Sequence, residues 1–122
     1  MDQRIEVVFL GVTDIDRARD FYVDKAGFVL DYDQRVSDEL RFVQLTPPGS
    51  ACSVTFGEGL TEVPPGMQHV LIVVPDADAA REELLGRGLQ VAPVEDLAWG
   101  RFVYYADPDG NRWSLQELPK RG

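Results

Sequence analysis

The sequence predicts an α+β fold built from two similar modules, each with the element order βαβββ. Residues 12–19 resemble residues 74–81 at an offset of 62, and residues 49–54 align with residues 110–115 at an offset of 61. In each half, a short apolar run is followed by a helical pattern and then by three segments with strand character. Two matches in the same order at nearly one offset indicate an internal repeat of about 60 residues.

The first module opens with an apolar run at residues 5–10, which is typical of a buried strand. Thr13 or Asp14 supplies an N-cap oxygen for the helix that follows, and the helix dipole favours Asp16 in its first turn. Gly27 suits the left-handed position at the end of this helix. Three strands are expected to follow, at residues 28–33, 40–46 and 51–56.

The second module repeats this order. A strand is expected at residues 68–74, then a helix from Asp76 that ends at Gly86 or Gly88. The segment Asp107–Asn111 is a strong turn signal between the last two strands. Three strands complete the module, at residues 89–92, 101–106 and 112–117. The chain is thus expected to form one domain, residues 1–122, with module one at about 1–60, module two at about 66–118, and a Gly- and Pro-rich linker at 57–66.

Composition and charge exclude several classes of protein. The 122 residues are 44% hydrophobic and 27% charged, which fits a globular domain rather than a disordered polymer. The formal net charge of −9 disfavours nucleic acid and anionic membranes as partners. No apolar run approaches the roughly 20 residues that span a bilayer, and the N-terminus lacks the features of a signal peptide. We therefore expect a soluble, cytoplasmic protein that binds neither nucleic acid nor membrane.

The sequence resembles a known family at both ends of the repeat. Val12–Tyr22 followed by Gly27-Phe28 is similar to the first helix of the glyoxalase/bleomycin-resistance/dioxygenase proteins, the vicinal oxygen chelate superfamily. Trp99-Gly100, Phe102 and Asp107–Asn111 resemble the closing signature of the second module. The resemblance implies sheets that curl around a cavity and assembly as a homodimer. It also implies a choice among metal-dependent lyases, isomerases and dioxygenases, thiol transferases, and metal-free antibiotic-sequestering proteins, because one fold supports many functions.

Metal-dependent members of this family place ligands at four inward positions, one on the first and one on the last strand of each module. By the resemblance these positions hold Val7, Ser53, His69 and Ser114. A hydrophobe and two neutral hydroxyls stand where imidazoles or carboxylates would bind Zn, Fe, Ni or Mn. We therefore predict a degenerate metal site and no cofactor, with a divalent metal held around His69 as the alternative.

His69 is the only histidine of the chain. It is the one candidate catalytic residue, as a general base, and the other roles open to it are a hydrogen-bonding anchor for a ligand or a relic metal ligand. It could equally be a partly buried histidine bonded to a carbonyl or water, with no role. Strand alternation directs Glu6 and Glu117 away from the inward faces. The predicted ligand-binding residues are Val7, Phe9, Ser53, Thr55, His69, Trp99, Ser114 and Gln116.

Trp99 lies at the expected mouth of the cavity, where it could stack on a flat ligand instead of packing in the core. The sequence does not fix which of Phe102, Tyr104 and Tyr105 face the cavity, because bulges are common in curled sheets. Cys52, the only cysteine, is expected to be a small buried hydrophobe.

Three hypotheses about function remain. The first is a metal-free protein that binds an apolar or aromatic small molecule and has a sequestering or resistance role. The second is an enzyme: a glyoxalase-like lyase, isomerase or dioxygenase with a degenerate metal site around His69, or a metal-free enzyme that uses His69 itself. The third is an accessory domain that acts through its dimer surface.

Overall fold

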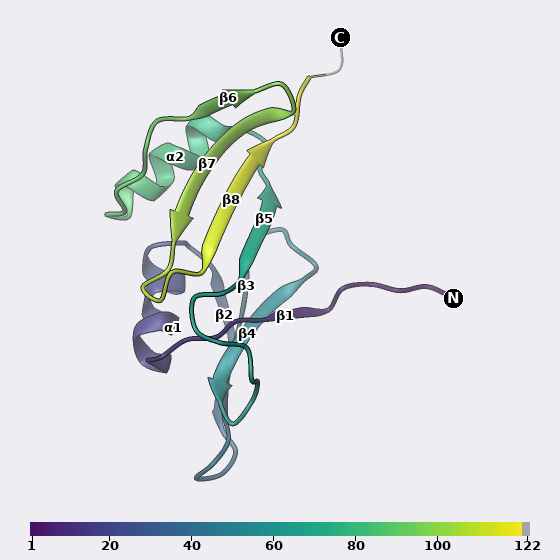
Figure 1. Cartoon of the computed structure of the whole chain (residues 1–122), viewed down its shortest axis with the longest axis vertical. Helices are drawn as coiled ribbons and strands as arrows, with labels where there is room; N and C mark the ends of the chain where they lie inside the picture. The colour runs from purple at the N-terminus through teal and green to yellow at the C-terminus, as the bar shows by residue number, and fades with distance from the viewer. Residues whose placement is uncertain (121–122) are drawn as a thin grey trace. The chain divides into compact units, whose positions relative to one another are not determined.

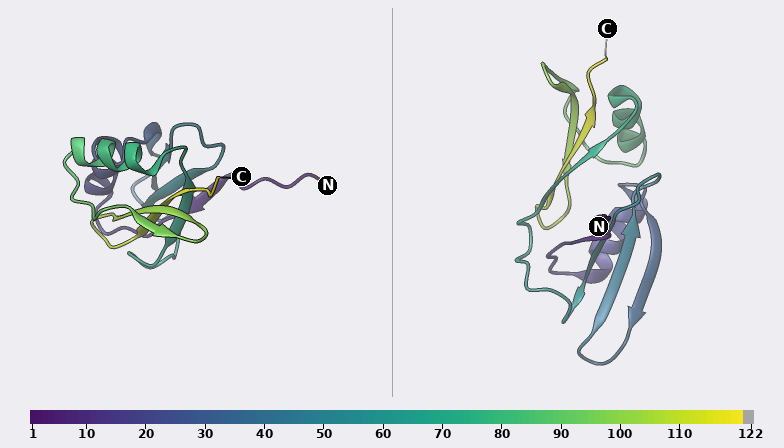
Figure 2. Two further views of the ribbon diagram at one scale, coloured as in Figure 1. Left: turned by 90° about the horizontal axis from the view of Figure 1, so that it is seen from above. Right: turned by 90° about the vertical axis from the view of Figure 1, so that its right-hand side faces the viewer.

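The computed structural model describes residues 1–120 and has an α+β architecture (Figure 1). Two four-stranded sheets have the orders β1-β4-β3-β2 and β5-β8-β7-β6, each with one helix on one face (Figure 2), which confirms two βαβββ modules. Within residues 1–120, neither helix is long and apolar enough to cross a membrane. The elements are β1 (Val7–Phe9), α1 (Ile15–Asp24), β2 (Val29–Arg35), β3 (Arg41–Thr46), β4 (Ser53–Glu58), β5 (His69–Val73), α2 (Ala77–Gly86), β6 (Glu95–Leu97), β7 (Gly100–Ala106) and β8 (Arg112–Glu117).

The prediction of a strand at residues 89–92 is wrong, because these residues form no strand. The strand of this region is β6, which begins three residues later at Glu95. The guanidinium of Arg81 in α2 donates to the carbonyl oxygens of Val91 and Ala92 at 3.3 and 3.0 Å. An arginine side chain, and not a neighbouring strand, therefore satisfies the backbone of this apolar segment.

The predicted linker begins too early, because β4 continues through Gly57 to Glu58. A Cβ on Gly57 would collide with the backbone carbonyl of Arg41 on the neighbouring strand. Gly57 is therefore a position of close strand approach and not a linker glycine.

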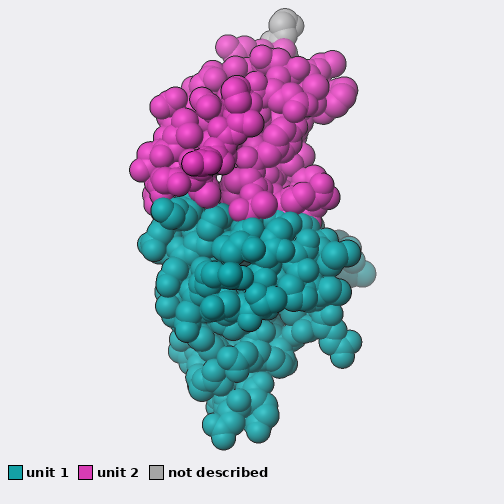
Figure 3. Space-filling view, turned by 60° about the vertical axis from the view of Figure 1, so that its left-hand side comes forward, with its two compact units in different colours: residues 1–68, 107–111 teal, residues 69–106, 112–122 magenta. Residues whose placement is uncertain are grey.

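The described chain divides into two compact units (Figure 3). Unit 1 comprises residues 1–68 and 107–111, and unit 2 comprises residues 69–106 and the chain from residue 112. The turn at 107–111, which connects β7 and β8 of the second module, is grouped with unit 1. Within each unit, the helix covers one face of the sheet and encloses the core between them.

Each helix begins at an aspartate that caps it. Asp14 accepts a hydrogen bond from the backbone N–H of Arg17 at 3.0 Å, and Asp76 accepts one from Ala79 at 3.1 Å. The cap of α1 is thus Asp14 and not Thr13, the other candidate. Such caps satisfy a backbone donor that the first helical turn leaves free, so the repeated aspartate sets where both helices start.

The internal repeat extends to a pair of ion networks. Arg41 in β3 donates to Asp16 of α1 at 2.7 Å and to Asp33 of β2 at 3.0 Å. Hydrogen bonds and charge from Arg41 lower the pKa of both carboxyl groups. This network joins the first turn of α1 to two strands of the same sheet. Ion pairs therefore fix the helix to its sheet in addition to core packing.

The corresponding network in unit 2 centres on Arg101 in β7. Its guanidinium donates to Asp78 of α2 and to Asp96 of β6, both at 2.7 Å. The hydrogen bond from Arg101 lowers the pKa of Asp78. The acidic side chains at the start of both helices are thus paired within the protein.

The turn Asp107–Asn111 is a hairpin turn, as its sequence predicts. The carboxylate of Asp107 is 5% exposed and accepts four hydrogen bonds. One oxygen accepts from the backbone N–H groups of Asp109 and Asn111 at 3.0 and 2.9 Å, and the other accepts from the Tyr22 hydroxyl at 2.7 Å and the Asn111 amide at 2.8 Å. Through these four hydrogen bonds the buried carboxylate of Asp107 holds the turn together and fixes it to Tyr22 of α1.

Candidate functional site

The first sheet gathers four of the predicted ligand-binding residues on the face away from α1. The parallel register pairs Val7 with Ser53 and Phe9 with Thr55. Strand alternation places the residues between them, such as Val54, toward the helix. The predicted shared face of these four residues is therefore present in unit 1.

Hydrogen bonds within the sheet already occupy the two hydroxyls on this face. Thr55 Oγ1 donates to the carbonyl oxygen of Val43 at 2.9 Å. Ser53 Oγ lies 2.6 Å from Thr46 Oγ1. Ser53 and Thr55 are 6% and 5% exposed, whereas Phe9 is 39% exposed. On this face the apolar side chain, and not the hydroxyls, is the more available to a ligand.

The second sheet carries three further candidates on the face away from α2, which we call the open face. Successive pairs along β5 and β8 are His69 with Arg112, Leu71 with Ser114, and Val73 with Gln116. The pairs between β8 and β7 extend this face across Tyr104 and Phe102, and Glu95 of β6 lies level with Phe102. The open face therefore comprises His69, Leu71, Val73, Glu95, Phe102, Tyr104, Arg112, Ser114 and Gln116.

The register also settles the direction of the β7 aromatic residues. Phe102 and Tyr104 are on the open face, and their rings stack with centroids 5.9 Å apart and an interplanar angle of 6°. Tyr105 faces α2, where its ring stacks on the buried Trp113 at 6.1 Å. Tyr104 remains 41% exposed on the outside of its stack. Phe102 and Tyr104 thus point to the open face, where only Tyr104 is exposed, and Tyr105 is core.

His69 and Ser114 are directly bonded on the open face. His69 Nε2 lies 2.7 Å from Ser114 Oγ. In the first sheet the corresponding residues Val7 and Ser53 are directly paired. In the second sheet Ser114 is paired with Leu71, so the bond from Ser114 to His69 runs diagonally between the strands. Within residues 1–120 the other ring nitrogen of His69 has no hydrogen-bond partner. The pair therefore lacks the acidic group that orients the base of a catalytic triad, but it can bind a polar group of a ligand.

The metal-ligand positions do not form a divalent metal site. Ser53 and Ser114 are engaged in hydrogen bonds, and Val7 has no donor atom. In the part of the chain that the structure describes, no group of three or more His, Cys, Asp or Glu side chains is arranged to hold a metal ion. Glu117 does not reach the open face, because its carboxylate accepts from the backbone N–H of Ala77 at the start of α2 at 2.8 Å. The donors present do not fit Zn, Fe, Ni or Mn.

Trp99 lies in the tight turn between β6 and β7 and is 61% exposed. Its carbonyl oxygen accepts a hydrogen bond from Gln116 Nε2 at 2.8 Å. Gln116, a predicted ligand-binding residue, thus holds the turn that carries Trp99. The indole is exposed and is not part of the core of unit 2.

Burial raises the pKa of the Tyr104 hydroxyl, and the negative charge of Glu95 raises it further. Tyr104 therefore stays protonated at neutral pH and offers a hydrogen-bond donor beside the aromatic stack.

Cys52, which the sequence predicts to be buried, is half-buried. Partial burial raises the pKa of its thiol, and the negative charge of Glu6 raises it further. The thiolate form, which is the reactive one, is therefore disfavoured.

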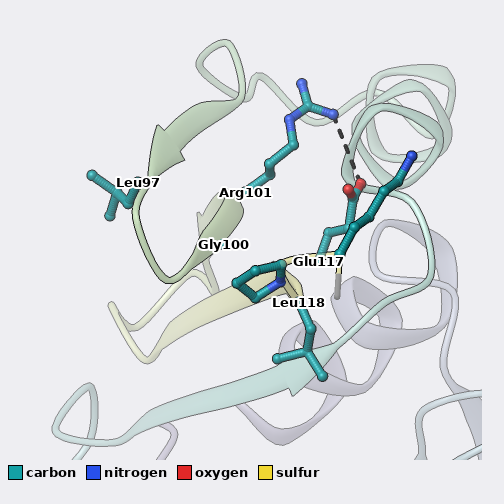
Figure 4. A pocket seen from close by; sticks show the side chains of 7 residues that line it. Leu97, Gly100, Arg101, Glu117 and Leu118 are labelled. Carbon is teal, nitrogen blue, oxygen red and sulfur yellow. Dashed lines mark ion pairs between the residues drawn. The ribbon is translucent and has the colours of Figure 1, made fainter. Parts of the chain in front are cut away.

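A surface pocket of about 280 Å³ lies in unit 2, beside the end of the open face (Figure 4). An ion pair between Arg101 and Glu117, with an N–O distance of 3.7 Å, lies in its wall. None of the predicted ligand-binding residues lines the pocket, although Trp99 and Gln116 directly precede two of the lining residues in the sequence. The lining residues are Leu97, Gly100, Arg101, Glu117, Leu118, Pro119 and Lys120.

The sequence analysis did not identify Leu71, Val73, Glu95 and Arg112 as members of the open face, and it left the directions of Phe102 and Tyr104 open. Counting alternate residues from Ser114 along β8 would have found Arg112, and counting from His69 along β5 would have found Leu71. Tyr104 needed the pairing of β7 with β8, which the sequence alone does not provide.

The chain belongs to the Glyoxalase/Bleomycin resistance protein/Dioxygenase superfamily, whose pattern it matches over residues 4–115. It is similar to TnmS3, an antibiotic binding protein from Streptomyces sp. CB03234. The two are 31% identical with a TM-score of 0.85, covering 97% of this chain and 98% of TnmS3. A glyoxalase/bleomycin resistance protein from the same strain is 32% identical with a TM-score of 0.79, covering 93% of this chain and 100% of its own. The uncharacterised protein YetH of Bacillus subtilis strain 168 is 24% identical over 120 residues, 96% of this chain and 100% of YetH.

Proposed function

We propose that this protein is a metal-free binder of an apolar, planar aromatic small molecule and that it sequesters this molecule. The observation that carries the proposal is the stacked pair Phe102–Tyr104 on the open face, with one ring of the pair exposed. Leu71, 50% exposed, and Trp99 add apolar surface in the same unit. Exposed aromatic and aliphatic side chains of this kind favour a flat apolar ligand.

Polar groups on the open face would orient such a ligand. The bonded pair of His69 and Ser114 leaves one imidazole nitrogen available, and Tyr104 keeps its hydroxyl proton. A few polar groups beside apolar surface are typical of small-molecule sites. The similarity to TnmS3, which is an antibiotic binding protein, supports a binding role over catalysis.

A homodimer is part of this proposal. The first sheet leaves Phe9, Val29 and Tyr32 between 39% and 54% exposed on its helix-free face. A second copy of the chain would remove such apolar side chains from water, which is favourable by roughly 25 cal/mol per Å². Light scattering at micromolar concentration tests this assembly, and a mass equal to that of one chain would contradict it.

Tryptophan fluorescence tests the binding function. We expect planar aromatic compounds, such as anthraquinones and acridines, to quench the emission with micromolar or better affinity. Because Trp113 is 1% exposed and Trp99 is 61% exposed, the quenched component belongs to Trp99. Trp99→Phe should remove that component while calorimetry still detects binding. If no compound of the panel binds by either method, the proposed function is wrong.

Thermal unfolding with added metals tests the metal-free part of the proposal. An ion that binds only the folded state raises the unfolding temperature. We expect no chelator-reversible increase with millimolar Zn²⁺, Ni²⁺, Mn²⁺ or Fe²⁺, because His69 has no convergent carboxylate or imidazole partner among the described residues. An increase of several degrees that His69→Ala abolishes would favour the enzyme hypothesis instead.

A further inference from the structure

The side chain of Arg112, on the open face of unit 2, has no partner among the described residues. The guanidinium of Arg112 makes no ion pair and no hydrogen bond with residues 1–120, although the chain has a formal net charge of −9. In the same unit, Arg101 contacts two aspartates and Arg81 donates to two carbonyl oxygens. An exposed arginine that avoids an excess of acidic groups keeps all five N–H donors available to a ligand.

Arg112 is placed at one end of the open face. It is level with His69 on one side and with Ala106 on the other. The next pair along the strands brings Leu71, Ser114 and Tyr104 side by side, roughly 7 Å away. Ala106 contributes only a methyl group next to Arg112. A cationic and hydrogen-bonding end therefore adjoins the aromatic stack directly.

Few acidic groups face this end of the sheet. Glu95, the one acid of the open face, is level with Phe102, two pairs away from Arg112. Asp107 follows Ala106 in the chain, but its carboxylate is buried in the turn of unit 1 and accepts four hydrogen bonds. The charge at the His69–Arg112 end thus complements an anion and not a cation.

We propose that the ligand is a planar aromatic acid, whose ring packs on Tyr104 and whose anionic group is bound by Arg112 and the free nitrogen of His69. This inference rests on the proposed function and specifies the class of ligand. Guanidinium groups bind carboxylates through two parallel hydrogen bonds, a geometry that a lysine cannot reproduce. The aromatic stack supplies affinity for the ring, and Arg112 supplies selectivity for the acid.

A matched pair of probes separates the contribution of the aromatic ring from that of the anionic group. Calorimetry at pH 7.5 compares anthracene-2-carboxylate with anthracene-2-carboxamide, which has the same ring system and no charge. We expect the carboxylate to bind the wild-type protein at least tenfold more tightly. Arg112→Gln should abolish this preference and leave the affinity for the carboxamide within twofold, while Arg112→Lys should retain only part of it.

The control variant is Lys25→Gln, which also removes one positive charge but lies at the end of α1 in unit 1. It should preserve the preference, and circular dichroism should show that all variants remain folded. Equal affinity of the wild-type protein for both probes would overturn this inference and leave the proposed function intact. Failure of both probes to bind would count against the binding function itself. An Arg112→Gln protein that changes its mass by light scattering and keeps the preference would assign Arg112 to a contact between copies and overturn the inference.

Discussion

Replacement of Asp107 by alanine should lower the free energy of unfolding by about 3–5 kcal/mol, the largest stability effect that we expect in this chain. The variant removes a buried carboxylate and with it four hydrogen bonds, including those from the Tyr22 hydroxyl and from the backbone N–H of Asn111. Unpaired buried donors are costly, whereas the same groups would be hydrated in the unfolded chain. The substitution should therefore destabilise the folded state.

Urea denaturation followed by circular dichroism measures this effect, with two variants for comparison. Tyr22→Phe removes one of the four hydrogen bonds and should cost about 1 kcal/mol. Asp38→Ala removes an exposed carboxylate in the turn between β2 and β3 and should change stability by about 0.5 kcal/mol or less. If Asp107→Ala and Asp38→Ala have equal midpoints, the network around Asp107 does not stabilise the fold.

The fold was largely predictable because each helix start and each strand leaves a local signal. The capping aspartates Asp14 and Asp76 and the periodicity after them define both helices from nearby residues alone. The strand predicted at 89–92 failed for the opposite reason. The segment has an apolar pattern typical of a strand, but Arg81 of α2 donates hydrogen bonds to its backbone carbonyl oxygens. No local pattern in the sequence reveals this contact.

The site was predictable only in part. Alternation along β8 correctly placed Ser114 and Gln116 on one face, since this depends on neighbouring residues. The bond between His69 and Ser114 depends on the register between β5 and β8, which no local pattern in the sequence defines. The same alternation would have placed Arg112 on this face, but the lack of a partner for its guanidinium among the described residues is visible only in the structure.

The superfamily includes enzymes as well as binding proteins, so the function must be argued from the open face and not from the fold. The imidazole of His69 is bonded to a hydroxyl and has no acidic partner among the described residues, which disfavours a general base. The exposed aromatic stack instead favours affinity for a flat molecule. Binding is therefore the better-supported function, and its energetic centre should be Tyr104.

Tyr104→Ala should weaken the binding of anthracene-2-carboxamide about tenfold, or ~1.4 kcal/mol, because it removes the exposed ring of the stack. Phe102, the other ring of the stack, is 5% exposed and cannot replace the lost contact area. Tyr104→Phe keeps the ring and should change the affinity by less than about threefold, the range expected for one weak hydrogen bond.

Calorimetry with the uncharged probe isolates this apolar contribution from that of Arg112. Leu85→Ala is the matched control, since it also shortens an exposed apolar side chain but lies on α2, away from the open face. It should bind the probe as the wild-type protein does. Should Tyr104→Ala and Leu85→Ala bind anthracene-2-carboxamide equally well, the stacked pair is not the binding surface, and the ligand must be sought on the helix-free face of the first sheet.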